Sequence, residues 1–177
     1  WQELLTKLEC SPLLVMGVIN FIRQNQLLEF YEASDYLRDS EQTALPALAS
    51  LCELIKQRLL ALPVSYKILH SCIFLAPAPI LPEFFNHPDF ATNMDEVYAG
   101  LRLLAGFGLL SGQQELTLSP LGLKVLQSMM LPELNESLAL VNTLTHTVQA
   151  KLDANNFAVI KLVAHLQKMY ELLQQLD

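Results

Sequence analysis

The sequence predicts a mainly α fold, built from a helical lid-like bundle, a winged helix with a small β-hairpin and a C-terminal helical hairpin. Three observations predict it. Hydrophobic residues make up 52% of the 177 residues and charged residues 16%, which excludes a disordered chain. Apolar residues recur every three or four positions along most of the chain, which is typical of helices. At residues 109–118, a glycine turn separates two short apolar runs, which predicts the hairpin.

We divide the chain into three regions: a helical lid-like region at 1–62, a winged-helix domain at 63–130 and a helical hairpin at 131–177. No apolar run approaches the roughly 18–20 residues of a membrane-spanning helix, so we expect no membrane partner. The chain opens at Trp1 without an initiator methionine or a basic leader, so we expect a piece of a longer, cytoplasmic protein.

The first region shows a clear helix start. Ser11 and Pro12 form an N-cap followed by proline at the first helical position, which predicts a helix that runs to about Arg23. Apolar side chains surround this helix almost completely, so we expect it to be deeply buried. Further helices are expected over 27–38 and 44–61.

The second region has the order helix, helix, helix, hairpin, helix, which is compatible with a winged helix. The expected helices are 64–75, 80–86, 93–105 and a last one that Ser119 and Pro120 open and that runs through Met130. Asn93 is the expected cap of the third helix. Such a unit serves either as a packing module or as a DNA reader.

The third region is expected to be a pair of amphipathic helices joined by a turn at 153–156. The expected inner faces are Leu134, Leu138, Val141, Val148 and Leu152 on the first helix, and Val159, Val163, Leu166, Tyr170 and Leu173 on the second. The second helix also carries another apolar stripe, made of Leu162, Leu166, Met169, Leu173 and Leu176. This extra stripe fits either a partner groove or a face that packs on a following helical repeat.

Charge argues against a nucleic-acid partner. The chain has 11 Lys and Arg against 18 Asp and Glu, a formal net charge of −7. The expected third helix of the winged helix has Asp95 and Glu96 near its start and Arg102 as its one strong base, and the hairpin carries Glu115 without Lys or Arg. Since much of the affinity for DNA comes from cations that neutralise phosphates, we do not expect DNA binding.

Sequence signatures of a self-contained catalytic site are absent. The sequence contains no GxxxxGK[ST], GxSxG, HExxH or GxGxxG motif. Because the four histidines have no evident orienting partner, we expect each at the surface or at its boundary: His70, His87, His146 and His165. The three cysteines, Cys10, Cys52 and Cys72, are far apart with apolar neighbours, which predicts reduced core thiols and no zinc site. We expect no enzyme activity and no metal in this chain.

Three stretches share the spacing of one known family. In Leu8 to Arg23, a helix begins at Pro12, two residues after Cys10. Leu51 to Pro77 joins a long helix, a Leu-Pro pair and an apolar helix, and Leu104 to Leu121 contains the runs LAGFGLLS and LTLSPL. With these stretches, the chain resembles the segment that follows the nucleotide-binding core in STAND-type regulatory NTPases of the NB-ARC class. Its tail is similar to the stretch that enters the helical repeats of that family.

The resemblance implies two cofactor-binding residues. In that family a glycine-x-proline motif begins a lid helix, and its proline, matched here by Pro12, packs near the adenine. A histidine in the third stretch senses the ADP phosphate, and Ser119 is the nearest residue to that position. The resemblance also implies ATP or ADP with Mg²⁺ as cofactors of the parent protein, with none in this fragment.

The implied function is that of a non-catalytic regulatory segment in a nucleotide-dependent signalling switch. Its implied partners are the nucleotide-binding domain and the helical repeats of the same parent chain, with self-association on activation. The lid and winged helix would pack on the core when ADP is bound and rotate away when ATP and an inducer bind. Two other interpretations stay open: an acidic winged-helix transcription regulator with a helical dimerisation tail, and a helical protein-interaction scaffold.

Overall fold

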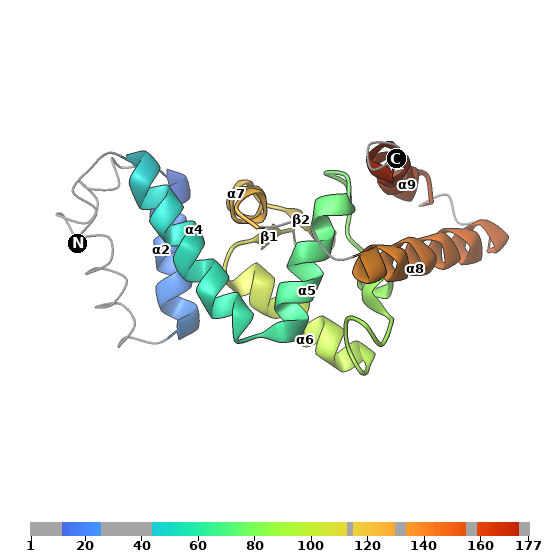
Figure 1. Ribbon diagram of the computed structural model, residues 1–177, viewed down its shortest axis with the longest axis horizontal. Helices are drawn as coiled ribbons and strands as arrows, with labels where there is room; N and C mark the ends of the chain where they lie inside the picture. Colours follow the sequence, from blue (N-terminus) through green and yellow to red (C-terminus); the bar gives the residue numbers. More distant parts are fainter. Residues whose placement is uncertain (1–11, 26–43, 113–114, 130–133, 155–158, 174–177) are drawn as a thin grey trace.

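The chain forms three groups of elements that follow one another along the long axis of the molecule (Figure 1). The structure, a computed structural model, describes residues 12–25, 44–112, 115–129, 134–154 and 159–173. These residues are mainly helical, with one small antiparallel sheet, so the predicted fold class is confirmed. Within the described ranges, no helix combines the length and the apolar character that crossing a membrane requires.

Helices α2 (Pro12–Asn25) and α4 (Ala44–Leu60) lie side by side at one end. Gly17 makes the close approach possible, since a Cβ there would lie 2.8 Å from a methyl group of Leu51. The expectation that α2 is deeply buried is wrong: Gly17 and Val18 are buried, whereas Met16 is 54% exposed. Packing partners cover one side of this helix, and its apolar composition does not reveal that. The expected Ser11 cap and the helix at 27–38 lie outside the described residues.

The middle group has the element order of a winged helix. Its helical elements are α5 (Pro63–Ser71), the 3₁₀ helices η1 (Cys72–Phe74) and η2 (Pro82–Phe85), α6 (Met94–Gly106) and α7 (Pro120–Gln127). The predicted cap of α6 is confirmed, because the Asn93 side chain accepts a hydrogen bond from the Glu96 amide at 3.0 Å. Helix α7 ends at Gln127, one turn earlier than expected.

A hairpin of β1 (Leu110–Ser111) and β2 (Thr117–Leu118) forms the wing, as predicted, with Leu110 opposite Leu118. Ile80 forms an isolated antiparallel bridge with Leu116, because its amide donates to the Leu116 carbonyl at 2.7 Å. The expected helix at 80–86 is therefore wrong at its start. Pro82 disfavours helical backbone at the preceding residue, Leu81, which is extended, so helical structure begins only at Pro82.

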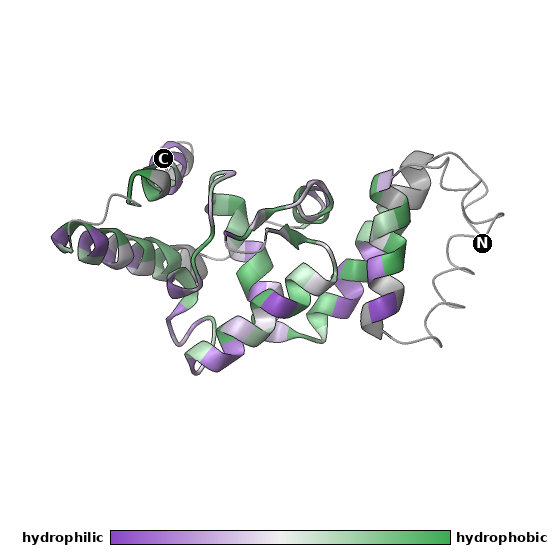
Figure 2. Ribbon diagram, turned by 180° about the vertical axis from the view of Figure 1, so that it is seen from behind, coloured by the Kyte–Doolittle hydropathy of each residue, from purple (hydrophilic) through white to green (hydrophobic). Residues whose placement is uncertain are grey.

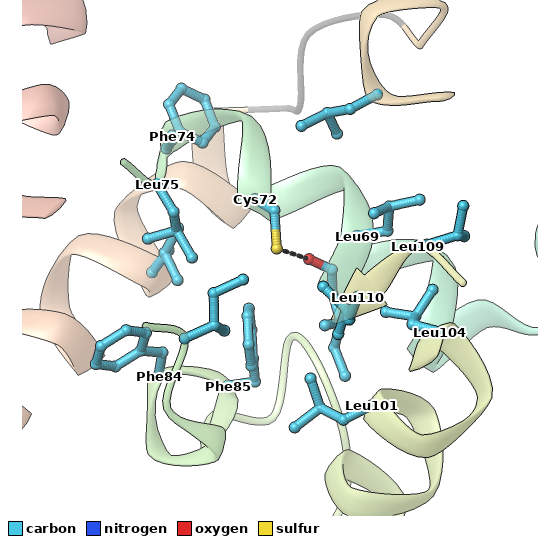
Figure 3. Packing of buried hydrophobic residues seen from close by; sticks show 14 of the residues in the cluster. Leu69, Cys72, Phe74, Leu75, Phe84, Phe85, Leu101, Leu104, Leu109 and Leu110 are labelled. Carbon is cyan, nitrogen blue, oxygen red and sulfur yellow. Dashed lines mark hydrogen bonds between the residues drawn. The ribbon is translucent and has the colours of Figure 1, made fainter. Parts of the chain in front are cut away.

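The central part of the core lies between α5, α6, η2 and the hairpin (Figure 3), and the buried cluster continues into α4 and α8. Phe84, Phe85 and Phe107 are among its largest fully buried side chains. Cys72 lies among them and donates from Sγ to the Ile68 carbonyl at 3.2 Å, and burial raises the pKa of its thiol to about 12. Cys52 is also buried and free, so the expected core thiols are confirmed for these two residues, and Cys10 lies outside the described residues.

Helices α8 (Leu134–Asp153) and α9 (Ile160–Leu173) form the expected pair at the other end (Figure 1). Their inner faces agree with the expected ones in part, since the predicted Val148 and Val159 are buried. On α8 the buried residues include Leu140 and Leu144, whereas the predicted Leu138 and Leu152 are 48% and 51% exposed. On α9 the second stripe is the covered one, with Leu162 and Met169 buried, whereas Val163 and Tyr170 of the first stripe are exposed. A helix with two apolar stripes does not reveal which of them meets the protein.

Candidate functional site

Pro12, the residue matched to the adenine-binding proline, begins α2 and is exposed. Further along this helix, Gly17 and Asn20 face the start of the hairpin and of α7. A Cβ on Gly17 would lie 3.0 Å from Leu121, and one on Gly108 would lie 2.4 Å from the Asn20 amide nitrogen. Helix α2 is therefore packed tightly on the segment that contains the second predicted residue, Ser119.

Ser119 is buried and caps α7. Its hydroxyl accepts from the Gly122 amide at 2.9 Å and donates to the Gly108 carbonyl at 2.6 Å, and its own amide donates to the Leu109 carbonyl. A hydroxyl has a single proton to donate, so in this arrangement none is left for a phosphate. Ser119 thus joins the hairpin to α7, whereas Pro12 is exposed at the start of α2. Their assignment to a nucleotide stays a prediction.

Helix α6, which would read DNA in a winged-helix regulator, presents few cations. The Glu96 carboxylate accepts from the Thr92 amide at 2.9 Å, and this hydrogen bond lowers the pKa of Glu96 below its ordinary value. Asp95 is exposed beside it, and the Arg102 Nε donates to the Tyr98 carbonyl of the same helix at 3.2 Å. The surface near the start of α6 is therefore acidic.

An apolar hollow of about 270 Å³ adjoins this acidic surface, between the start of α5 and α6. Val64, Ala99 and Leu103 contribute to its lining. Gly100 lies on the same wall and keeps the two helices close, since a Cβ there would lie 3.1 Å from Ile68 and 3.2 Å from Val64. An apolar hollow next to carboxylates suits a protein side chain better than a phosphate backbone.

Sequence analysis did not predict a polar contact between the C-terminal helix α9 and the winged helix. His165 on α9 has no exposed surface, which corrects the expectation of a boundary position, and His70 is buried as well. The His165 Nδ1 accepts from the Ala76 amide at 3.0 Å, so Nε2 carries the proton and donates to the Pro79 carbonyl at 2.8 Å. One turn later, the Lys168 ammonium donates to the Leu75 carbonyl at 2.6 Å. We call His165 and Lys168 together the tail latch.

The tail latch depends on a neutral imidazole, because a proton on Nδ1 would face the Ala76 amide proton. Burial is the main cause that lowers the pKa of His165, and the Lys168 ammonium lowers it further, whereas the hydrogen bond to Pro79 opposes the shift. Burial also lowers the pKa of Lys168, while the buried Cys72 thiol on η1 opposes that shift. The ring of Phe84 packs edge-on against the imidazole, with centroids 5.5 Å apart.

We predict that the protein loses stability when the pH falls below about 6.5, the ordinary histidine pKa. Because the pKa of His165 is lowered in the folded state, the unfolded chain binds the extra proton first, and stability rises with pH between the folded and unfolded values. This residue can contribute at most about 1.4 kcal/mol per pH unit. Urea unfolding at pH 7.5, 6.5 and 5.5 measures the effect. The His165→Gln variant, which lacks the titrating ring, should show a smaller loss over that window, and an equal loss would contradict the assignment.

A signal for His165 does exist in the sequence. Leu162, His165 and Met169 follow one another at three- and four-residue spacing, and all three are buried. A histidine that is buried with such a stripe needs hydrogen-bond partners, which the neighbouring segment can supply from its backbone. Here the neighbour is the stretch 75–79, in which Pro77 and Pro79 have no amide proton.

Among the described residues, no group of three or more histidine, cysteine and acidic side chains is placed to hold a metal ion. Comparison with protein families, with curated proteins and with solved structures finds no match for the chain. The function is therefore inferred from the geometry and from the resemblance described above.

Proposed function

We propose that the chain is a non-catalytic regulatory segment of a nucleotide-dependent signalling switch. Its winged helix packs on a nucleotide-binding domain of the same parent chain, and its tail leads toward helical repeats. Pro12 contacts the nucleotide bound by that domain, and Ser119 lies at the sensor position. The parent protein binds ATP or ADP with Mg²⁺ and self-associates on activation, in the cytoplasm.

The surface of α6 is the observation that carries this proposal. A DNA reader needs cations on this helix and on the wing, whereas α6 presents Glu96 at an apolar hollow, and Arg102 is its one strong base. Residues 63–130 contain three Lys and Arg residues, which are Lys67, Arg102 and Lys124, against five acidic ones, which are Glu83, Asp89, Asp95, Glu96 and Glu115. The Lys67 ammonium donates a hydrogen bond to the Asp89 carbonyl at 2.7 Å. One of these three cations is therefore engaged with the protein's own backbone.

A switch needs an interface with two discrete arrangements, and in this proposal the tail latch defines one of them. In the described structure, α9 is held on the segment 75–79 by three hydrogen bonds, from His165 and Lys168. Breaking one of these hydrogen bonds leaves a polar atom without its partner, which costs free energy. Movement of the winged helix on its partner would thus be passed to the tail through this contact.

Calorimetric titration of the chain with ATP and with ADP, in the presence of Mg²⁺, tests the proposal. We expect no binding and no ATP hydrolysis, because the phosphate-binding elements lie in the partner domain. Micromolar ATP binding to this chain alone would contradict the proposal. The proposal also requires a phosphate loop and an acidic Walker-B strand in the parent chain, and a parent sequence without them would refute it.

The acidic transcription regulator is the second candidate, favoured by the winged-helix order of elements alone. Fluorescence anisotropy with random duplex DNA at low salt separates the two. We expect no change in anisotropy. Binding that weakens steeply as salt is added would instead support the regulator, since such weakening reports phosphate contacts.

A further inference from the structure

A groove of about 790 Å³ runs between η2 and the middle of α8, away from the α6 hollow and from the predicted nucleotide residues. Glu83, Asn86 and His87 line one wall, and Asn142, His146 and Lys151 line the other. Figure 2 shows hydrophilic residues along this part of the tail. The volume lies in the range of ordinary ligand sites.

The two walls are held at a fixed separation. The Thr143 hydroxyl donates to the Phe84 carbonyl at 2.5 Å, which ties α8 directly to η2. Leu144 and Val148 are buried behind the α8 wall, and Phe84 and Phe85 are buried behind the η2 wall. The groove is thus present before any ligand arrives, which lowers the entropic cost of binding.

The Thr143 and Thr147 hydroxyls donate to backbone carbonyls, whereas three other polar side chains of the groove are not used by the fold. Asn86, Asn142 and His146 are exposed, and within the described ranges none of them has a side-chain hydrogen bond or ion pair. The His87 Nδ1 faces the amide and carboxylate of Asp89, at 3.3 and 3.4 Å, which leaves its Nε2 for a ligand. Two carboxamides and two imidazoles therefore line one groove, and each carboxamide can both donate and accept.

The lining excludes several kinds of ligand. Lys151 and Glu83 balance each other's charge, so a phosphate would find no excess of cations. No described group of three or more metal-ligating side chains exists for a cation. Ala150 and the threonine side chains add apolar surface, and no Phe, Tyr or Trp lines the groove, so a sugar would have only the two imidazoles to stack on.

An extended polypeptide backbone fits what remains. It is uncharged and offers alternating donors and acceptors, and each carboxamide can satisfy one of each. From Asn142 to Lys151 the α8 wall is about 13 Å long at 1.5 Å per residue, which matches about four residues of extended chain at about 3.3 Å each. We propose that the groove between η2 and α8 binds an extended peptide segment of about four uncharged residues from a partner protein. This proposal does not depend on the nucleotide switch.

Selection from a phage-displayed random heptapeptide library on the immobilised full chain provides the probe. The enriched peptides are synthesised with a fluorescent label and titrated with wild-type protein. We expect micromolar affinity that falls at least tenfold in the double variant Asn142→Ala/His146→Ala. Gln149→Ala is the matched control, because Gln149 is exposed on α8 outside the groove, and its affinity should stay within twofold of wild type.

A second measurement does not depend on the variants. In the ¹⁵N–¹H spectrum of the wild-type chain, peptide addition should shift the side-chain amides of Asn86 and Asn142. The proposal is overturned if no peptide is enriched relative to the double variant, if the double variant binds as tightly as wild type, or if the shifts fall on the exposed face of α9 around Val163 and Tyr170. Displacement of the peptide by inorganic phosphate or maltose would overturn it too, since the site would then be one for anions or sugars.

Discussion

Replacing His165 with alanine should lower the free energy of unfolding by about 3–5 kcal/mol, the largest effect that we expect from a single side chain of the tail. The substitution leaves the buried Ala76 amide and the half-buried Pro79 carbonyl without their partner, and it opens a cavity against Phe84. Each unpaired buried group costs about 1–3 kcal/mol, because water cannot replace the lost bond. Urea unfolding followed by circular dichroism measures the change.

His146→Ala is the matched control, since His146 is exposed on α8 and lies in no buried contact. Its effect should stay within about 0.5 kcal/mol. A separate, early transition in His165→Ala would show that the tail unfolds from an intact winged helix, whereas a single shifted transition would show that the tail and the winged helix unfold together. A loss as small as that of His146→Ala would refute the tail latch.

Features set by local chemistry could be predicted from the sequence. The Asn93 cap, the Ser119–Pro120 helix start and the glycine turn of the hairpin each depend on residues within about four positions of one another, and all three are found. The mainly α fold with one hairpin follows from the same short-range signals.

Features set by distant partners could not be predicted. The His165 contacts join residues 89 and 86 positions apart in the chain, so the apolar stripe around His165 can indicate its burial but not its hydrogen-bond partners. For the same reason, the sequence did not reveal which side of α2 is exposed or which apolar stripe of α9 faces the protein. Burial depends on which segments pack against each helix. Ser119 has one contact of each kind. The sequence pattern predicted that it caps α7, but not its hydrogen bond to the Gly108 carbonyl on the other side of the hairpin.

The second large effect is expected at Gly122, in the first turn of α7. A Cβ at this position would lie 2.1 Å from the carbonyl oxygen of Leu109, a backbone atom that also accepts the Ser119 amide. In an exposed helix, glycine-to-alanine replacement stabilises by about 1 kcal/mol through helix propensity. Here we expect Gly122→Ala to destabilise the protein by about 2–4 kcal/mol, because the clash can be relieved only by moving the hairpin away from α7.

The sign of this change decides between the two effects. Leu123→Ala serves as the control, since Leu123 is the exposed neighbour in the same helix and its replacement should change stability by less than about 1 kcal/mol. A Gly122→Ala variant more stable than wild type would mean that helix propensity dominates and that the contact with Leu109 is loose. A destabilised variant would show instead that the hairpin and α7 are pressed together as one unit. In that case Ser119, which lies at the centre of that unit, could reach a nucleotide only after the whole junction opened.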